Sequence, residues 1–442
     1  MAVTFRGGLH IDDHKSSTNA VPIKQLDGCE IHVYPLQQHI GAPLNPLVAV
    51  GDRVLAGQKI AGSDAFVSAP VHSSVSGKVK AIEPRLHPSG AMVTSIVVEN
   101  DGDYEKCPSV SAKGDYSKYS PKEIIGFIRE AGIVGMGGAG FPTHVKLSPG
   151  PDKKITHVIV NGAECEPYLT SDHRRMLETP EAVLLGLKVV MHIFGLEKGY
   201  VGIELNKPDA IEAMRKEAAK EGVIEIVPLK TKYPQGAEKQ LINAVTKKSV
   251  PSGGLPADVG CVVINVDTAT AIGRIFTTGE PLISRIVTVS GDCVAEPCNY
   301  ETLTGCPVSY VFDQCGGFVK EPKKIISGGP MMGTALFSLD VPIIKTSSGI
   351  LAVSKTSANF AEDSVCIKCG KCVDMCPMRL MPLYLNKYSQ EGNVEMAEKY
   401  NVMDCIECGV CSYLCPGKKH PLQGIRLMKQ IIMEKRRSQQ KK

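Results

Sequence analysis

Residues 366–377 read CIKCGKCVDMCP, and residues 405–416 read CIECGVCSYLCP. Both stretches have the spacing C-x2-C-x2-C-x3-C-P, and the second repeats the first at an offset of 39 residues. Three cysteines this close can hold one corner of an iron–sulfur cubane, while the cysteine before proline points to the other cluster. The spacing therefore predicts two [4Fe–4S] clusters. Their predicted ligands are Cys366, Cys369, Cys372 and Cys415 for the first cluster, and Cys405, Cys408, Cys411 and Cys376 for the second.

Two structural zinc sites are the alternative reading of these cysteines. Zinc takes four tetrahedral ligands, commonly as two C-x2-C pairs with a long spacer between them. A duplicated triplet followed by Cys-Pro fits that arrangement poorly.

Clusters alone relay single electrons, and their potentials span about −700 to +450 mV, so the motif does not set the direction of electron flow.

Length and composition describe a globular protein of several domains. The chain has 442 residues, which is too long for one core. Its net charge is +4, and 43% of its residues are hydrophobic. The small charge gives no reason to expect a nucleic-acid partner. No signal-like or 18-residue apolar run is present, so we expect no membrane span and a reducing cytoplasm in which cysteines serve as metal ligands. Eight of the 16 cysteines fall between residues 366 and 415.

The N-terminal part of the chain is rich in strand signals. Residues 1–30 look like an irregular lead-in, and residues 31–98 hold short apolar runs separated by Gly, Asp and Pro. This pattern predicts a domain over 1–105 that resembles the barrel-sandwich fold of biotinyl and lipoyl domains. Those domains carry a modified lysine at a hairpin tip, whereas the matching stretch 62–69 reads GSDAFVSA. We therefore interpret the domain as structural.

Strands and helices alternate over residues 120–265, which predicts an α/β domain with a largely parallel sheet. Its first helix is expected to start at Ser120, because Ser120, Pro121 and Glu123 have the pattern of a capping box. Residues 266–320 predict a small α+β module around an acidic helix start at 299–303, and residues 320–355 look irregular. The cysteine-rich domain is expected over 355–420. Residues 421–442 predict an amphipathic helix with a basic tail from 435 to 442, which is either solvated or in contact with a partner or an anionic lipid surface.

A glycine-rich loop is the second strong signal. Residues 135–146 read GMGGAGFPTHVK. Successive amides in such a loop can cradle a phosphate, and Lys146 could supply a counter-charge. A glycine-rich loop alone does not identify a phosphate site, because many such loops are plain turns. This one lacks the G-x-G-x-x-G order of a Rossmann fold.

Three further segments follow the loop in order: 161–167 reads NGAECEP, 233–238 reads YPQGAE, and 265–268 reads NVDT. With the loop, they resemble the NADH-binding, FMN-containing flavoprotein subunit of respiratory complex I. Ala163 and Ala237 depart from that family's pattern, where acidic residues stand.

The resemblance implies a role for each matching residue. The FMN phosphate would lie on Gly135, Gly137, Gly138, Gly140 and Lys146. The ribityl chain and phosphate would be held by Asn161, Asn265 and Thr268, with Glu164, Tyr233, Gly236 and Glu238 near the flavin. Two residues would act on NADH, Phe141 by stacking and Glu166 at the nicotinamide end. Glu164 and Glu166 could instead be surface carboxylates, Tyr233 could be core packing, and Cys165 is interpreted as a bystander.

The flavin also fits the electron chemistry. NADH gives up two electrons as a hydride, a cluster accepts one, and a flavin can accept two and release them singly. The order of domains, together with the stretch 327–333 (SGGPMMG) and a segment at 277–317 that is similar to a soluble-ligand-binding (SLBB) β-grasp domain, resembles the C subunit of the Rnf electron transport complex over nearly the whole chain.

That resemblance implies a multidomain α/β and α+β fold and a peripheral subunit on the cytoplasmic face of the cell membrane. It implies NAD(H):ferredoxin oxidoreductase activity through FMN and two [4Fe–4S] clusters. Integral membrane and ferredoxin-like subunits would be partners, ferredoxin would be reached indirectly, and the electron flow would be coupled to Na⁺ or H⁺ translocation. Two alternatives stay open: a stand-alone NADH-dependent flavin/Fe–S reductase similar to the cobalamin reductase of propanediol-degrading microcompartments, and an electron relay without flavin.

Overall fold

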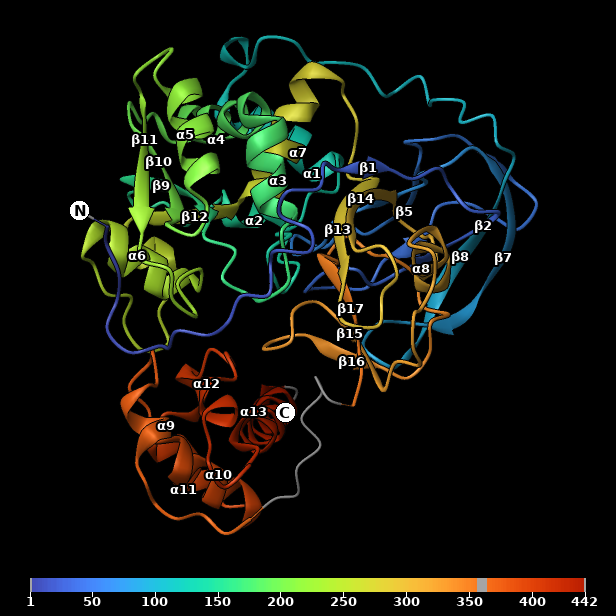
Figure 1. The fold of residues 1–442 in the computed structure, drawn as a ribbon. Coiled ribbons are helices and arrows are strands. Elements are labelled where there is room, and N and C mark those ends of the chain that lie inside the picture. The colour runs from blue at the N-terminus through green and yellow to red at the C-terminus, as the bar shows by residue number, and fades with distance from the viewer. Residues whose placement is uncertain (1, 356–363, 441–442) are drawn as a thin grey trace.

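The computed structural model describes residues 2–355 and 364–440, and its ribbon is shown in Figure 1. The boundary predicted at residue 355 for the cysteine-rich domain adjoins residues 356–363, which lie outside the described residues. The last two residues of the predicted basic tail also lie outside them. The domain limits given above remain predictions. The fold classes of the domains are those expected.

The barrel-sandwich module consists of two antiparallel sheets, with the orders β2-β8-β7-β4 and β3-β5-β6. Alternate strand residues point inward, and Tyr34, Ile60 and Ile96 form part of the core between the sheets. The loop 63–70 packs against the neighbouring domain, where His144 Nε2 donates to the carbonyl of Phe66 at 2.9 Å. The strands are β2 Ile31–Pro35, β3 Asn45–Pro46, β4 Arg53–Val54, β5 Lys59–Gly62, β6 Val71–His72, β7 Gly77–Leu86 and β8 Met92–Asn100.

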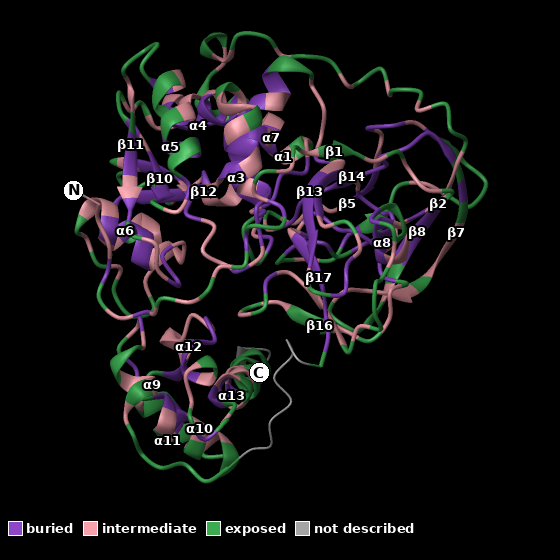
Figure 2. Cartoon of the chain, viewed as in Figure 1, coloured by how far each residue is buried: buried purple, intermediate pink, exposed green. Residues whose placement is uncertain are grey.

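The α/β domain is built on a parallel sheet with the order β11-β10-β9-β12. Its strands are buried on both sides, as Figure 2 shows, because helices cover each face. Its elements are η1 Tyr116–Lys118, α1 Pro121–Glu130, α2 Thr143–Lys146, β9 His157–Gly162, α3 Ser171–Glu178, α4 Pro180–Phe194, β10 Gly199–Glu204, α5 Pro208–Ala218, β11 Ile224–Leu229, α6 Glu238–Thr246, η2 Pro256–Val259, β12 Cys261–Asn265 and α7 Val266–Thr277.

Local sequence explains how these layers form. The Ser120 hydroxyl accepts from the Glu123 amide and the Glu123 carboxylate accepts from the Ser120 amide, so the capping box expected at the start of α1 is present. Helices α1, α4, α5 and α7 pack on one face of the sheet, and α6 packs on the other. Gly186 lets α4 approach α7, since a Cβ there would collide with the carbonyl of Ala269. Helix α7 thus packs within the α/β domain, although its residues were expected in the next module.

The β-grasp module holds a six-stranded sheet with the order β1-β14-β13-β17-β15-β16. The helix start expected at 299–303 is wrong, because these residues lie in strand β14 and are mostly buried. The irregular chain expected over 320–355 is also wrong, since three strands of the sheet come from it. The elements are β1 Lys24–Gln25, β13 Ser284–Ser290, β14 Cys298–Leu303, α8 Val308–Gln314, β15 Lys324–Ser327, β16 Thr334–Leu336 and β17 Gly349–Val353.

The first 25 residues leave the barrel-sandwich and lie along other modules. Val3 bridges to Leu229 at the edge of the parallel sheet, and Leu9 bridges to Tyr233. Strand β1 then pairs with β14 of the β-grasp sheet. The expected lead-in is therefore a strap across the α/β domain.

The cluster domain is helical and lies below the α/β domain in Figure 1. Helix α13 buries Ile425, Met428 and Ile432 at helical spacing, which confirms the predicted amphipathic helix. Within the described residues its elements are α9 Lys371–Asp374, α10 Pro382–Gln390, α11 Val394–Lys399, η3 Val402–Asp404, α12 Val410–Tyr413 and α13 Pro421–Gln440.

Candidate functional site

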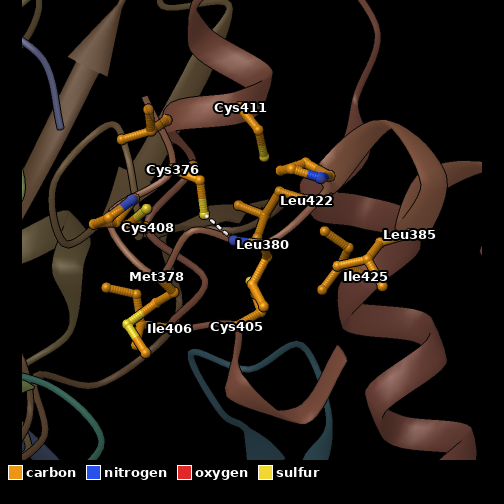
Figure 3. A pocket seen from close by; sticks show the side chains of 14 residues that line it. Cys376, Met378, Leu380, Leu385, Cys405, Ile406, Cys408, Cys411, Leu422 and Ile425 are labelled. Carbon is orange, nitrogen blue, oxygen red and sulfur yellow. Dashed lines mark hydrogen bonds between the residues drawn. The ribbon is translucent and has the colours of Figure 1, made fainter. Parts of the chain in front are cut away.

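Two cavities in the cluster domain bring the repeated cysteines together. The inner cavity is lined by Cys376, Cys405, Cys408 and Cys411 together with apolar side chains such as Leu380 and Ile425 (Figure 3). The outer cavity is lined by Cys366, Cys369, Cys372 and Cys415. The space between the lining atoms, open solvent included, is about 370 Å³ in each, so the two cavities are similar in size. The two sets of four are those that the sequence assigned to separate clusters.

The repeat in sequence is also a repeat in backbone shape. Lys368 and Glu407 have φ of 53° and 57°, and Gly370 and Gly409 have φ of 78° and 77°. A four-residue helix, α9 or α12, follows each glycine. Left-handed residues turn the chain back on itself, so that closely spaced sulfurs converge on one point. The same turn is therefore built twice.

The donor set fits a cubane cluster better than a hard cation, since thiolates are the ligands of Fe–S clusters. Burial raises the pKa of Cys408 to about 12 and raises the pKa of Cys411. Iron would replace these protons. Backbone amides also reach the sulfurs: Leu380 N donates to Cys376 Sγ, and Glu407 N donates to Cys405 Sγ, each at 3.4 Å. Hydrogen bonds of this kind tune cluster potentials.

The two cavities differ in their surroundings. Cys408 and Cys411 of the inner cavity are buried, whereas Cys366 and Cys369 of the outer cavity are exposed. The inner cavity also touches the α/β domain, where Gln240 Nε2 donates to the Pro377 carbonyl at 3.2 Å. The inner cavity is thus the one next to the glycine loop's domain, and the outer cavity faces solvent.

The glycine loop meets the N-terminus of α7. Met136 N donates to Thr268 Oγ1 at 3.1 Å, and a Cβ on Gly137 would lie 3.1 Å from Asn265 Cβ. Asn265 caps the helix, its Oδ1 accepting from the Asp267 and Thr268 amides. A helix N-terminus beside exposed amides of a glycine loop favours a phosphate. Gly135, Gly138, Gly140 and the half-buried Phe141 complete this loop.

The other predicted FMN residues lie close to one another in pairs. Lys146 Nζ donates to Glu238 Oε1 at 2.8 Å, and Asn161 Nδ2 donates to the Gly236 carbonyl at 2.7 Å. These residues come from three distant segments, so the fold assembles them around one edge of the parallel sheet. A lysine ammonium and the backbone amides beside a helix N-terminus form a donor set that fits the phosphate of a flavin mononucleotide.

The Glu164 side chain is buried, and its carboxylate lies at the N-terminus of α3. Its carboxylate accepts from the amides of Asp172 and His173 at 2.7 and 3.2 Å. The Asp172 carboxyl, in turn, accepts from Asn265 Nδ2 at 2.7 Å. Burial, with Glu164 nearby, raises the pKa of Asp172 well above its usual range. Asp172 was not singled out in the sequence, where an isolated acidic residue gives no signal of its burial.

Glu166 and Tyr233 connect the α/β domain to the inner cavity. Tyr233 Oη lies 2.7 Å from the carbonyl of Cys408 and 3.2 Å from Glu166 Oε1. A phenol has one proton to donate, and the closer acceptor is the carbonyl. Met331 N donates to the other oxygen of Glu166 at 3.1 Å. Glu166 and Tyr233 are therefore neither a surface carboxylate nor only packing.

We expect the Glu166→Gln variant to gain stability relative to the wild type as the pH rises. Burial raises the pKa of Glu166 to about 7. Between about pH 4.5 and 7 the folded chain therefore binds a proton that the unfolded chain lacks. This contribution to stability is full at low pH and is lost as the pH rises through 7. Urea unfolding from pH 5.5 to 8 should show the free energy of unfolding of the variant, relative to that of the wild type, increasing by about 2 kcal/mol.

The control is Glu212→Gln, because Glu212 is exposed on α5. The free energy of unfolding of this control should differ from that of the wild type by the same amount at every pH. A flat difference for Glu166→Gln as well would show that the Glu166 carboxyl is ionised at neutral pH in the folded protein.

Lys15 is a residue that the sequence analysis missed. Its buried ammonium donates to the carbonyl oxygens of Glu164, Glu166 and Leu169, the first two at 2.9 and 3.0 Å. The strap thereby fixes the loop that carries both predicted carboxylates. No motif surrounds Lys15, so nothing local in the sequence distinguishes it from a surface lysine.

Comparison with known proteins gives a domain match for each part of the chain. Four family models match: an RnfC barrel sandwich hybrid domain at residues 3–103, a Nuo51 FMN-binding domain at 128–274, an SLBB domain at 286–335 and a 4Fe-4S dicluster domain at 358–416. The chain is 50% identical to the C subunit of the Na⁺-translocating ferredoxin:NAD⁺ oxidoreductase complex of Acetobacterium woodii, over 98% of each chain. The chain belongs to the family of Rnf C subunits.

Two further Rnf C subunits show how closely the family agrees. The one from the proton-translocating ferredoxin:NAD⁺ oxidoreductase complex of Clostridium ljungdahlii is 51% identical, over 91% of this chain and 88% of that one. The one from the ion-translocating oxidoreductase complex of Rhodobacter capsulatus is 41% identical, over 90% and 78%. FMN and [4Fe–4S] clusters are accordingly the cofactors of this Rnf C subunit.

Solved structures share the fold. An NAD⁺-reducing [NiFe]-hydrogenase in the air-oxidized state superposes with a TM-score of 0.51 at 22% identity, covering 65% of this chain and 55% of that one. An NAD⁺-reducing [NiFe]-hydrogenase in the H2-reduced state superposes with a TM-score of 0.51 at 19% identity, covering 70% of this chain and 61% of that one. In the part of the Rnf C subunit that the structure describes, helices are too short or too polar to cross a membrane.

Proposed function

We propose that this Rnf C subunit exchanges electrons between NAD(H) and ferredoxin as part of an ion-translocating complex. The observation that carries the proposal is the hydrogen bond of 2.7 Å from Tyr233 to the carbonyl of Cys408. It joins the domain that holds the predicted FMN residues to Cys408, a predicted cluster ligand that lines the inner cavity. Bound FMN would supply the conversion between two-electron and one-electron transfer.

The chain's own residues have separate tasks in this proposal. Gly135, Gly137, Gly138 and Gly140 would present amides to the FMN phosphate, with Lys146, Asn161, Asn265 and Thr268 as polar partners. Glu164, Tyr233, Gly236 and Glu238 would lie near the flavin, and Phe141 and Glu166 would contact NAD(H). The inner and outer sets of cysteines each hold one [4Fe–4S] cluster.

Burial favours one order of the two clusters. The inner cavity contacts Tyr233 and α6, whereas exposed Cys366 and Cys369 belong to the outer cavity. Electrons would therefore pass between FMN and the inner cluster, and then between the outer cluster and a partner. We propose that these partners are integral membrane and ferredoxin-like subunits, and that this subunit lies peripherally on the cytoplasmic face of the cell membrane. The relatives' names cover both Na⁺ and proton coupling.

The Gly138→Ala variant tests the FMN site. Gly138 is exposed, and among the described residues no atom lies within 4 Å of a Cβ placed there. The protein itself therefore tolerates alanine, while a methyl group would occupy space that the FMN phosphate needs. We expect FMN affinity to fall at least about tenfold, or about 1.4 kcal/mol, with an unchanged melting temperature. Fluorescence titration of FMN-free protein measures it.

Gly150→Ala is the matched control, since a Cβ there also meets nothing within 4 Å in the part of the chain that the structure describes. It should change neither FMN affinity nor stability. Equal FMN affinity in both variants would place the phosphate away from the glycine loop. A protein that holds iron but takes up no FMN would favour the electron relay without flavin.

A further inference from the structure

Two thiols and an imidazole meet where the barrel-sandwich and β-grasp modules join. Cys29 precedes β2, His32 is the second residue of β2, and Cys306 lies between β14 and α8. Cys29 Sγ, a ring nitrogen of His32 and Cys306 Sγ all lie within 4.8 Å of one another. His32 and Cys306 are fully buried. This group lies outside both cluster cavities.

The tautomer of His32 leaves one ring nitrogen without a proton, so that its lone pair can bind a metal. His32 Nδ1 lies 3.0 Å from the carbonyl oxygen of Thr304, which can only accept, so Nδ1 carries the proton. Nε2 therefore has a lone pair, and it lies 3.8 Å from Cys306 Sγ. Metal-binding histidines commonly donate their second nitrogen to a backbone carbonyl in this way.

The distance between His32 and Cys306 is close to the ligand spacing of a tetrahedral zinc site. Zinc–sulfur and zinc–nitrogen bonds of about 2.3 and 2.0 Å place the two ligand atoms about 3.5 Å apart. The observed 3.8 Å between Nε2 and Sγ is near that value. Gly28 keeps this side of the ring open, because a Cβ there would lie 2.9 Å from Nε2.

We propose that Cys29, His32 and Cys306 bind one Zn²⁺ ion that links the two modules. Two thiolates and one imidazole are soft and borderline ligands, which favour zinc over magnesium, calcium or manganese. Binding would release one proton from each cysteine thiol, and water would take the fourth position. The ligands are 274 residues apart in sequence, so the ion would hold together modules that otherwise meet through contacts such as Val33 N to the Gly305 carbonyl.

The test measures zinc and iron together in the full, anaerobically purified chain with its clusters. We expect about one zinc per chain in addition to the cluster iron. X-ray absorption at the zinc edge should show two sulfur neighbours near 2.3 Å and one nitrogen near 2.0 Å. Cys29→Ala should lower zinc at least about tenfold and leave iron unchanged. Since Cys29 lies in a loop and is only half-buried, this variant retains the buried ligands.

Cys107→Ala is the matched control, because Cys107 is also a half-buried loop cysteine of the N-terminal part. It should keep its zinc. The proposal is overturned if Cys29→Ala keeps as much zinc as the wild type, which would place the ion in cluster cysteines. It is also overturned if the wild type binds no added Zn²⁺, or if mass spectrometry without reductant shows a Cys29–Cys306 disulfide.

Discussion

Replacing Cys408 with alanine is expected to slow electron exchange between NAD(H) and the outer cluster by more than about 100-fold, because a cubane requires its thiolate ligands. The substitution removes only the sulfur. The backbone carbonyl that accepts from Tyr233 remains, so the contact between domains is kept. Freeze-quench EPR after mixing with NADH, or with NAD⁺ after reduction, measures the rate for each cluster.

Cys369→Ala is the matched control for this experiment, because Cys369 occupies the same place in the repeat and belongs to the outer cavity. In that variant the inner cluster should still equilibrate with NAD(H) at the wild-type rate. If the outer cluster of Cys408→Ala also responds at the wild-type rate, the inner cavity is not on the route.

Replacing Lys15 with methionine is expected to destabilise the chain by about 3–5 kcal/mol and to weaken FMN binding, because buried carbonyls lose their donor. Methionine retains most of the volume of the side chain. The three acceptors are the carbonyls of Glu164, Glu166 and Leu169, so the loop beside the predicted FMN site would lose its anchor to the strap. Urea unfolding and FMN titration measure the two effects.

Lys248→Met provides the comparison, since Lys248 is only half-buried and donates to the Val259 carbonyl at 2.9 Å. We expect it to change stability by less than about 1 kcal/mol and FMN affinity not at all. Wild-type stability and FMN affinity in Lys15→Met would mean that the loop holds its shape without the strap.

Features fixed by local spacing were predictable from the sequence. The cysteine repeat identified two sets of four, and the structure gathers the same two sets in separate cavities. The capping box of Ser120 and Glu123 marked the start of α1, because both halves of that motif lie within one turn. The glycine loop was recognised for the same reason, since its chemistry depends on adjacent residues.

Features that depend on distant partners were not predictable. Glu301 looked like part of an acidic helix start, but in strand β14 it is buried against Arg274 at 2.8 Å and Arg175 at 3.5 Å. A carboxylate is tolerated in a buried strand only when such partners are present, and they come from other segments. Lys15 acts across about 150 residues of sequence in the same way. Pairing of β15 with β17 likewise joins short strands across a Gly-rich stretch.

The most direct test of electron exchange with NAD(H) uses the purified chain loaded with FMN and both clusters. The protein is reduced fully, freed of reductant and mixed with NAD⁺. We predict that absorbance at 340 nm will show up to about two NADH per chain, since FMN stores two electrons and each cluster one. The EPR signals of both clusters should disappear, whereas FMN-free protein should keep its clusters reduced. Equal cluster oxidation without FMN, or no NADH from the loaded chain, would contradict the proposed function.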